Sequence, residues 1–347
     1  MLPIAMTTGA SVFLIYDASP CLHRFGPFLS DVVGLIQPLF IFSMLFLTFC
    51  RIEPKDLKPH RWHWWLLLIQ GGLFSLLGVV AYLLISMLSV ESGDWVVLIE
   101  CAMLCLICPT ATAAAVVTRK LGGDVPGITT YIILINILAA VLVPLIVPLV
   151  HPVAEIDFWT AFSMIMAKVF PLLILPCLAA WLVRYLFPKL HRWFLKFPDL
   201  PFYIWSLALC LAIAITTKSI MRSDMSLFML AMMSLISLIC CVFQFGMGRL
   251  IGRSYRSRRD CRSVPAMTDS RHARSDSRHA RSDSRHARPD RASREITAGQ
   301  AMGQKNTIFA IWMAYTFMTP ESSIVGGFYS IWHNIYNSWQ LYRAGKE

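Results

Sequence analysis

Long apolar segments recur along the whole chain and limit what it can fold into. Hydrophobic residues make up 56% of the sequence and charged residues only 15%, a composition unlike that of a soluble domain. Ten segments have the composition of a membrane span, although the first is short for the roughly 20 residues that cross a bilayer. We therefore predict an all-α integral membrane protein with ten transmembrane helices. The expected spans are residues 2–16, 28–50, 64–88, 95–117, 128–150, 158–186, 202–217, 225–251, 297–318 and 322–341.

The basic residues between these spans predict an orientation, because cytoplasmic loops of membrane proteins are enriched in Lys and Arg. If the N-terminus is inside, most basic residues fall in inside loops, and Arg24, Lys218 and Arg222 are the ones left outside. We predict that both termini are cytoplasmic and that the protein lies in the inner (cytoplasmic) membrane. Without the short first span, the N-terminus would move outside and the other loops would keep their sides. The inside set is Arg51, Lys55, Lys58, Arg61, Arg119, Lys120, Arg184, Lys189, Arg192, Lys196, the arginine-rich segment, Arg343 and Lys346.

An arginine-rich segment, residues 253–294, carries most of the net charge of +11. It contains 13 Arg and 5 Asp, and residues 269–289 repeat a heptad as DSRHARS, DSRHARS, DSRHARP. Such a segment has too little apolar content to fold, so we predict a disordered cytoplasmic loop between two parts of one membrane domain, 1–252 and 295–347. The body of the chain is nearly neutral, and we expect no nucleic-acid partner. We interpret the repeat as a tolerated expansion within a loop. The functional alternative is that it contacts anionic lipid or RNA.

Two polar interruptions, residues 108–115 and 299–307, divide the fourth and ninth expected spans. The first contains Pro109 and two threonines, and the second combines glycines, amides and Lys305. Irregular, polar backbone at membrane depth is tolerated only where it is buried in protein or lines a wet cavity. Interrupted segments in corresponding halves of a chain indicate the binding site of a transporter. The sequence therefore predicts a site where the two interruptions meet.

The same residues resemble the bile acid:sodium symporter family. Residues 303–307 (GQKNT), followed by 330–335 (SIWHNI), are similar to the family's last two helices, which carry E-x-G-M-Q-N-[ST] and S-x-W-[HQ]-N. Residues 108–115 (CPTATAAA), running on to Gly123-Asp124, resemble its C-P-G-G-T-A-S-N…G-D. The similarity extends loosely over residues 28–343 outside the repeat loop. It implies two inverted five-helix repeats, whose broken fourth and ninth helices cross at the bilayer midplane.

The resemblance also implies that the usual sodium ligands are missing from this chain. Ala114, Ala115, Ala140 and Ala301 stand where the family has oxygen-bearing side chains, and Lys305 replaces a glutamine. Methyl groups cannot bind sodium, and an ammonium group would repel it. We therefore expect no sodium, no metal and no cofactor, with Lys305 taking the place of the cation. The alternative is that Lys305 extends to an aqueous vestibule and has little role.

The candidate residues follow from the two interruptions. Glu100 lies inside the fourth expected span, where it could pair with Lys305, carry a proton or sit near the outer vestibule. His333 could relay a proton or make a helix contact. A threonine of the site could instead bond to its own helix backbone. The predicted substrate-binding residues are Thr110, Thr112, Gln304, Lys305, Asn306 and Thr307. The possible coupling or pairing residues are Glu100, Gln70, Asn136 and His333.

The predicted function is secondary transport of a small organic anion, a carboxylate or sulfonate, by alternating access without sodium coupling. The alternatives are a sodium- or proton-coupled symporter of the same fold, an antiporter-like exchanger, a channel, and a ligand-binding membrane receptor that does not transport. An enzyme is not expected, because the sequence contains no HExxH or GxSxG motif and no intramembrane aspartate pair. The cysteines have no zinc-site spacing. The identity of the anion and the oligomeric state are not predicted.

Overall fold

Helices account for nearly all of the regular structure in the part of the chain that is described. The computed structural model describes residues 2–88, 93–151, 157–197, 200–255 and 291–345. Apart from two short 3₁₀ turns, the elements are α1 (Leu2–Asp17), α2 (Pro20–His23), α3 (Gly26–Phe49), α4 (Arg61–Leu88), α5 (Asp94–Ile107), α6 (Ala113–Lys120), α7 (Val125–Val150), α8 (Phe158–Leu186), α9 (Pro188–Leu195), α10 (Leu200–Arg222), α11 (Leu227–Ser254), α12 (Arg291–Gly303), α13 (Thr307–Phe317) and α14 (Ile324–Ala344).

Six helices in the described ranges are long and apolar enough to cross a membrane: α3, α4, α7, α8, α10 and α11. The fourth and ninth expected spans are each divided into two shorter helices, α5–α6 and α12–α13. The tenth, α14, is long but has a polar buried face that lowers its hydropathy. α1 has 16 residues and so extends only about 24 Å. An all-helical, multi-pass membrane protein is therefore confirmed, while the count of ten spans stays a prediction.

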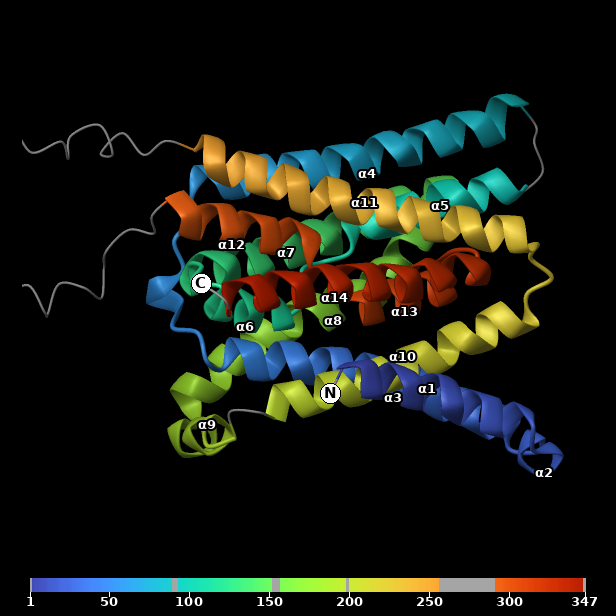
Figure 1. Cartoon of the computed structure of the whole chain (residues 1–347), viewed down its shortest axis with the longest axis horizontal. Coiled ribbons are helices and arrows are strands. Elements are labelled where there is room, and N and C mark those ends of the chain that lie inside the picture. Colours follow the sequence, from blue (N-terminus) through green and yellow to red (C-terminus); the bar gives the residue numbers. More distant parts are fainter. Residues whose placement is uncertain (1, 89–92, 152–156, 198–199, 256–290, 346–347) are drawn as a thin grey trace, which may run out of the picture.

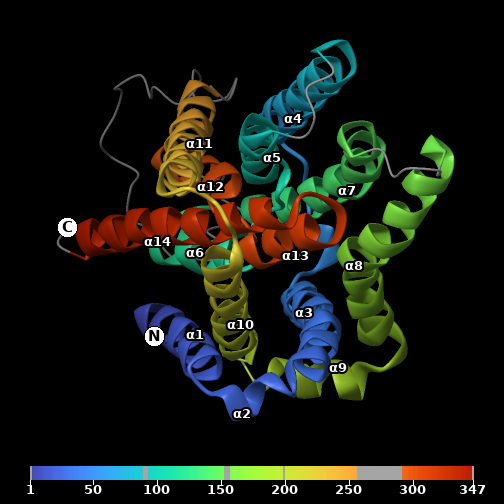
Figure 2. The same ribbon diagram turned by 90° about the vertical axis from the view of Figure 1, so that its right-hand side faces the viewer.

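The helices form two groups when the bundle is viewed along its length (Figure 2). One group consists of α1, α3, α8 and α10, in which α1 packs on α10 and α3 packs on both α8 and α10. The other group contains α4, α5, α6, α7, α11, α12, α13 and α14. The groups meet where α7 packs on α8 and where α13 packs on α3 and α10. This places the divided helices inside the molecule, between other helices.

One end of the bundle collects the basic segments. In Figure 1 it is the left-hand end, with α9, the start of α12 and the C-terminus. There the guanidinium group of Arg51 donates to the carbonyl of Phe197 at 2.8 Å, and that of Arg184 donates to the carbonyl of Ile52. At the opposite end, Asp157 caps α8, and its bonds from the hydroxyl and amide of Thr160 lower the pKa of its carboxyl group. Several of the described segments that the positive-inside rule groups together therefore lie at one end of the bundle.

Small residues let α11 and α12 approach closely. A Cβ atom on Gly248 would lie 2.3 Å from the carbonyl oxygen of Ala298, and one on Gly252 would lie 2.6 Å from that of Arg294. Two glycines four residues apart on one helix face are a common means of close helix packing in membranes. The contact fixes α12 against α11, and therefore fixes the position of the chain break that follows α12.

The predicted loop 253–294 differs from the structure at its two ends. Helix α11 continues to Ser254, and α12 begins at Arg291, so both ends of that range are helical. The heptad repeat at 269–289 lies outside the described residues.

Candidate functional site

The first chain break follows α5 and is caused by Pro109. A residue before proline is disfavoured in the α region, and Cys108 accordingly adopts φ −49° and ψ 126°. Helix α6 begins only at Ala113, so the break spans residues 108–112. The prediction placed the interruption at 108–115; the last three of these residues are helical.

The second break, between α12 and α13, is narrower than predicted. Of the residues 299–307, Gly299 to Gly303 belong to α12 and Thr307 starts α13, so only 304–306 are irregular. The side chain of Asn306 caps α13 by accepting the backbone N–H of Phe309 at 3.3 Å. Asn306 therefore has a structural role in starting the helix.

The two breaks lie against each other and pair through their main chains. Thr110 and Lys305 form an isolated antiparallel β-bridge. The amide of Ala111 donates to the carbonyl of Gln304 at 2.9 Å, and the amide of Asn306 donates to that of Pro109 at 2.8 Å. Such pairing satisfies backbone groups that have no helical partner at this depth. The sequence prediction that the two interruptions meet agrees with this placement.

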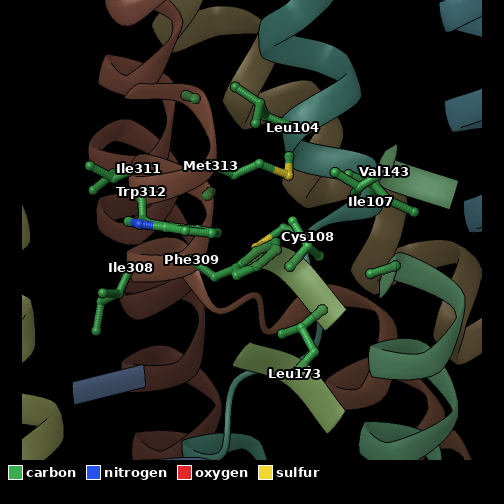
Figure 3. Close-up of a cluster of buried hydrophobic side chains, with 14 of the residues drawn as sticks. Leu104, Ile107, Cys108, Val143, Leu173, Ile308, Phe309, Ile311, Trp312 and Met313 are labelled. Atoms are coloured by element: carbon green, nitrogen blue, oxygen red, sulfur yellow. The ribbon is translucent and has the colours of Figure 1, made fainter. Parts of the chain in front are cut away.

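Side chains strengthen this crossing. The hydroxyl of Thr110 donates to the carbonyl of Ala301 at 2.5 Å, and the thiol of Cys108 donates to that of Asn306 at 2.8 Å. Figure 3 shows Cys108 among the apolar side chains that α5 and α13 contribute around it, including Phe309 and Met313. The crossing is thus held by hydrogen bonds within an apolar core.

Lys305 is almost completely buried at this crossing, with 1% of its surface exposed. Its ammonium group donates to the carbonyl of Leu106 at 3.0 Å, in the last turn of α5. That carbonyl has no partner within the helix, and the C-terminal end of a helix carries partial negative charge. Among the described residues, no carboxylate lies within 4 Å of the ammonium group. Lys305 therefore takes a position at a helix end that suits a cation.

Gln70 of α4 shares this acceptor. Its amide donates to the carbonyl of Leu106 at 2.8 Å, and its oxygen accepts a bond from the hydroxyl of Tyr131 on α7. Gln244 of α11 binds the preceding carbonyl, that of Cys105, at 3.1 Å. The carbonyl groups at the C-terminal end of α5 thus accept hydrogen bonds from side chains of the second break, α4 and α11.

Several candidate residues have buried polar atoms without a hydrogen-bond partner in the described part of the chain. They are both side-chain polar atoms of Asn136, the amide oxygen of Gln304 and Nδ1 of His333. Buried polar groups are normally satisfied, often by water, so these atoms are free to bind a solvent or ligand molecule. Thr307 is buried at the start of α13. Thr112 is half-buried, and its side chain does not cap α6.

Glu100 does not pair with Lys305. It is fully buried in α5, and its carboxylate contacts His151 at the end of α7 and Thr319 beyond the end of α13. The pairing that the sequence left open is therefore wrong, because the two charges lie at different levels of the bundle.

Sequence reasoning missed several residues of the crossing. Tyr131, Gln244 and Tyr329 are buried, and the hydroxyl of Tyr329 donates to the carbonyl of Gly303 at 2.8 Å. A glutamine within the apolar span of α11 is a signal that could have been noticed. The tyrosines give no such signal, because aromatic residues are common in membrane helices.

The comparisons with known proteins agree with this architecture. A family model, described as the SBF-like CPA transporter family, matches residues 9–342, which include both breaks and Lys305. No curated protein matches the chain. The match covers most of the chain and agrees with the resemblance to bile acid:sodium symporters drawn from the two interruptions. The chain therefore belongs to the SBF-like CPA transporter family and is a multi-pass membrane transporter.

Proposed function

We propose that the protein is a secondary transporter for a small organic anion, a carboxylate or sulfonate, and that it works by alternating access without sodium coupling. The observation that carries this proposal is the buried ammonium group of Lys305 at the paired chain breaks. An ammonium group has three N–H bonds, and the carbonyl of Leu106 uses one of them. The others are available to an anion.

Helix ends at the crossing favour the same ligand. The N-termini of α6 and α13 lie at the two breaks, and helix N-termini carry partial positive charge. The hydroxyl of Thr112 and the amide of Gln304 add polar groups beside them. A carboxylate or sulfonate has the charge and the acceptor oxygens that this arrangement suits. The same helix ends would give a neutral or cationic ligand no comparable stabilisation.

The residues at the crossing do not fit a sodium ion. Ala114, Ala140 and Ala301 are completely buried and present methyl groups, while the backbone oxygen of Ala301 already accepts the hydroxyl of Thr110. The lysine ammonium supplies positive charge at the open end of α5, where a cation would otherwise be favoured. The lack of side-chain oxygen ligands at these alanines, together with the lysine ammonium, supports transport that needs no sodium.

The wider architecture that we propose is ten spans arranged as two inverted five-helix repeats. One divided helix in each half of the chain, with its break against the other, supports this arrangement. We further propose that the end carrying the basic segments faces the cytoplasm, with both termini on that side of the inner membrane. Movement of one helix group against the other would then expose the crossing alternately to the two sides.

Uptake into proteoliposomes tests the proposal. A panel of labelled carboxylates and sulfonates is first screened by thermal shift, because a ligand that binds the folded state raises the melting temperature. Uptake of the best ligand is then compared for the wild type, Lys305→Gln and Asn306→Ala. Lys168→Gln is the matched control, because Lys168 lies in the apolar span α8 but is exposed. We expect Lys305→Gln and Asn306→Ala to lose uptake and Lys168→Gln to keep it.

The outcomes separate the alternatives. Unchanged uptake in Lys305→Gln would remove the site from the crossing. Binding without accumulation would identify a receptor, and flux that does not saturate would identify a channel. Since Asn306 also caps α13, its variant is interpreted only if its melting temperature stays within a few degrees of the wild type.

A further inference from the structure

A cavity of about 490 Å³ lies at the end of the bundle opposite the basic segments. Val96, Val150, Met318 and Thr319 contribute to its wall, together with the imidazole ring of His151. The cavity therefore adjoins the start of α5, the end of α7 and the end of α13. It is distant along α5 from the crossing, which lies at the other end of that helix.

Glu100 lies behind this wall and makes three hydrogen bonds. Oε1 contacts Nε2 of His151 and accepts the hydroxyl of Thr319 at 3.0 Å, while Oε2 accepts the amide of Thr319 at 3.2 Å. The two donors of Thr319 therefore hold the carboxyl group of Glu100 against the end of α13. The side chain of Glu100 has no exposed surface, whereas that of His151 is 28% exposed. His151 thus connects the cavity with the buried carboxylate.

The surroundings contain few competing charges. Among the described residues, the imidazole of His151 is the basic side chain that contacts the carboxyl group of Glu100. The ammonium group of Lys168 lies 5.6 Å from the ring centroid of Phe317, close to Thr319 in the sequence. The helices and turn that pack around α5 and the end of α13 also carry other ionisable side chains, among them Asp94, Cys101 and Cys105 of α5, Tyr82 of α4, Cys240 and Cys241 of α11, Tyr315 of α13, Glu321 of the 3₁₀ turn Pro320–Ser323, His333 of α14, and Lys305 at the crossing.

We infer that Glu100, His151 and Thr319 form a proton-binding site that links proton uptake from the cavity to the movement of the divided helices. A proton from water binds Nδ1 of His151, and the proton on Nε2 passes to Oε1 of Glu100. One proton is taken up, the imidazole ends neutral in its other tautomer, and the carboxylate becomes a carboxylic acid. This inference rests on the proposed function, to which it adds a coupling ion.

Protonation changes the connection between α5 and the end of α13. In the observed state, the carboxylate receives charge-assisted hydrogen bonds from Thr319, and such bonds are roughly twice as strong as neutral ones. A neutral Glu100 holds Thr319 more weakly. Because α5 and α13 lead directly to the two breaks, loosening this contact frees both helices to move at the crossing. Proton binding and anion binding would then act on the same two helices from opposite ends.

Hydrogen exchange of the full-length protein in detergent or nanodiscs tests the site without any transport substrate. The segment 318–323 is followed across a range of pH, after correction for the intrinsic pH dependence of exchange. In the wild type we expect this segment to exchange about fivefold faster at low pH than at high pH, because a charged hydrogen bond is replaced by a neutral one. In Glu100→Gln, which keeps an acceptor but cannot take up a proton, this pH response should vanish.

Glu321→Gln is the matched control, because it removes a carboxylate two residues from Thr319 and should leave the response intact. His151→Gln keeps a donor but cannot relay a proton, so it should also lose the response, and it carries the test if Glu100→Gln fails to fold. Exchange in the wild type that is independent of pH would show a purely structural contact and overturn the inference. An unaltered response in both variants would also overturn it. Neither result bears on anion uptake, so the two proposals fail separately.

Discussion

Lys305 and Glu100 are two buried ionisable side chains in one apolar bundle, and their polar contacts differ. Glu100 is matched by an imidazole and by two donors of Thr319. Lys305 has the carbonyl of Leu106 and no carboxylate within 4 Å among the described residues. A buried charge is costly unless it is paired. The partners of Glu100 thus belong to the protein, and we propose that the partner of Lys305 is the transported anion.

The largest effect is expected for Lys305→Met, which removes the charge and nearly preserves the volume. Losing a charged hydrogen bond to the anion costs about 3 kcal/mol, or more than a hundredfold in uptake. Replacing an incompletely paired buried charge with an apolar group should leave the melting temperature unchanged or raise it. Uptake and thermal unfolding are measured on the same preparation. A large fall in melting temperature would assign Lys305 a structural role.

Glu100→Met should lower the melting temperature, in contrast to Lys305→Met. It leaves the backbone amide of Thr319 and the imidazole of His151 without their acceptor, which we expect to cost about 3 kcal/mol of stability. The melting temperature in detergent should fall clearly below that of Lys305→Met. If the two variants are equally stable, the contrast between a paired and an unpaired charge is wrong.

Gly248→Ala probes the contact that positions α12. The added Cβ would meet the carbonyl oxygen of Ala298 at 2.3 Å, so α11 and α12 must separate, at a cost of about 2 kcal/mol. Gly246→Ala is the control on the same helix, since nothing lies within 4 Å of its Cβ position. Unfolding temperatures should fall for the first variant only. Equal stability of both would show that α11 and α12 do not need this close approach.

Gln70→Leu should have the smallest effect. The hydroxyl of Tyr131 loses its buried acceptor, which costs about 1 kcal/mol, while Lys305 keeps the carbonyl of Leu106. We expect uptake to fall by about fivefold. A complete loss of uptake in Gln70→Leu would place Gln70, and not Lys305, at the centre of the site.

Much of the fold follows from the sequence because apolar length and polar interruption are local signals. The six long helices and the two breaks lie close to the predicted positions. The breaks themselves are shorter than predicted, because small residues such as Ala113 and Gly303 can join a helix once their backbone partners are present. Composition alone cannot show where such a helix begins.

The candidate site was harder to predict, because its contacts join residues far apart in the chain. The grouping of Lys305 with Gln70 depends on one carbonyl, that of Leu106, which no sequence pattern can identify. Likewise, Glu100 is recognisable as a buried charge, but its partners His151 and Thr319 lie at the ends of other helices. Long-range packing, not local propensity, selects these partners.

The central claim is that the ammonium group of Lys305 stands in for a cation at the crossing. Uptake of the anion by the wild type, with all sodium replaced by choline, tests it most directly. We expect the same initial rate in choline as in sodium, and no uptake by Lys305→Met in either salt. A strict requirement for sodium in the wild type would contradict it.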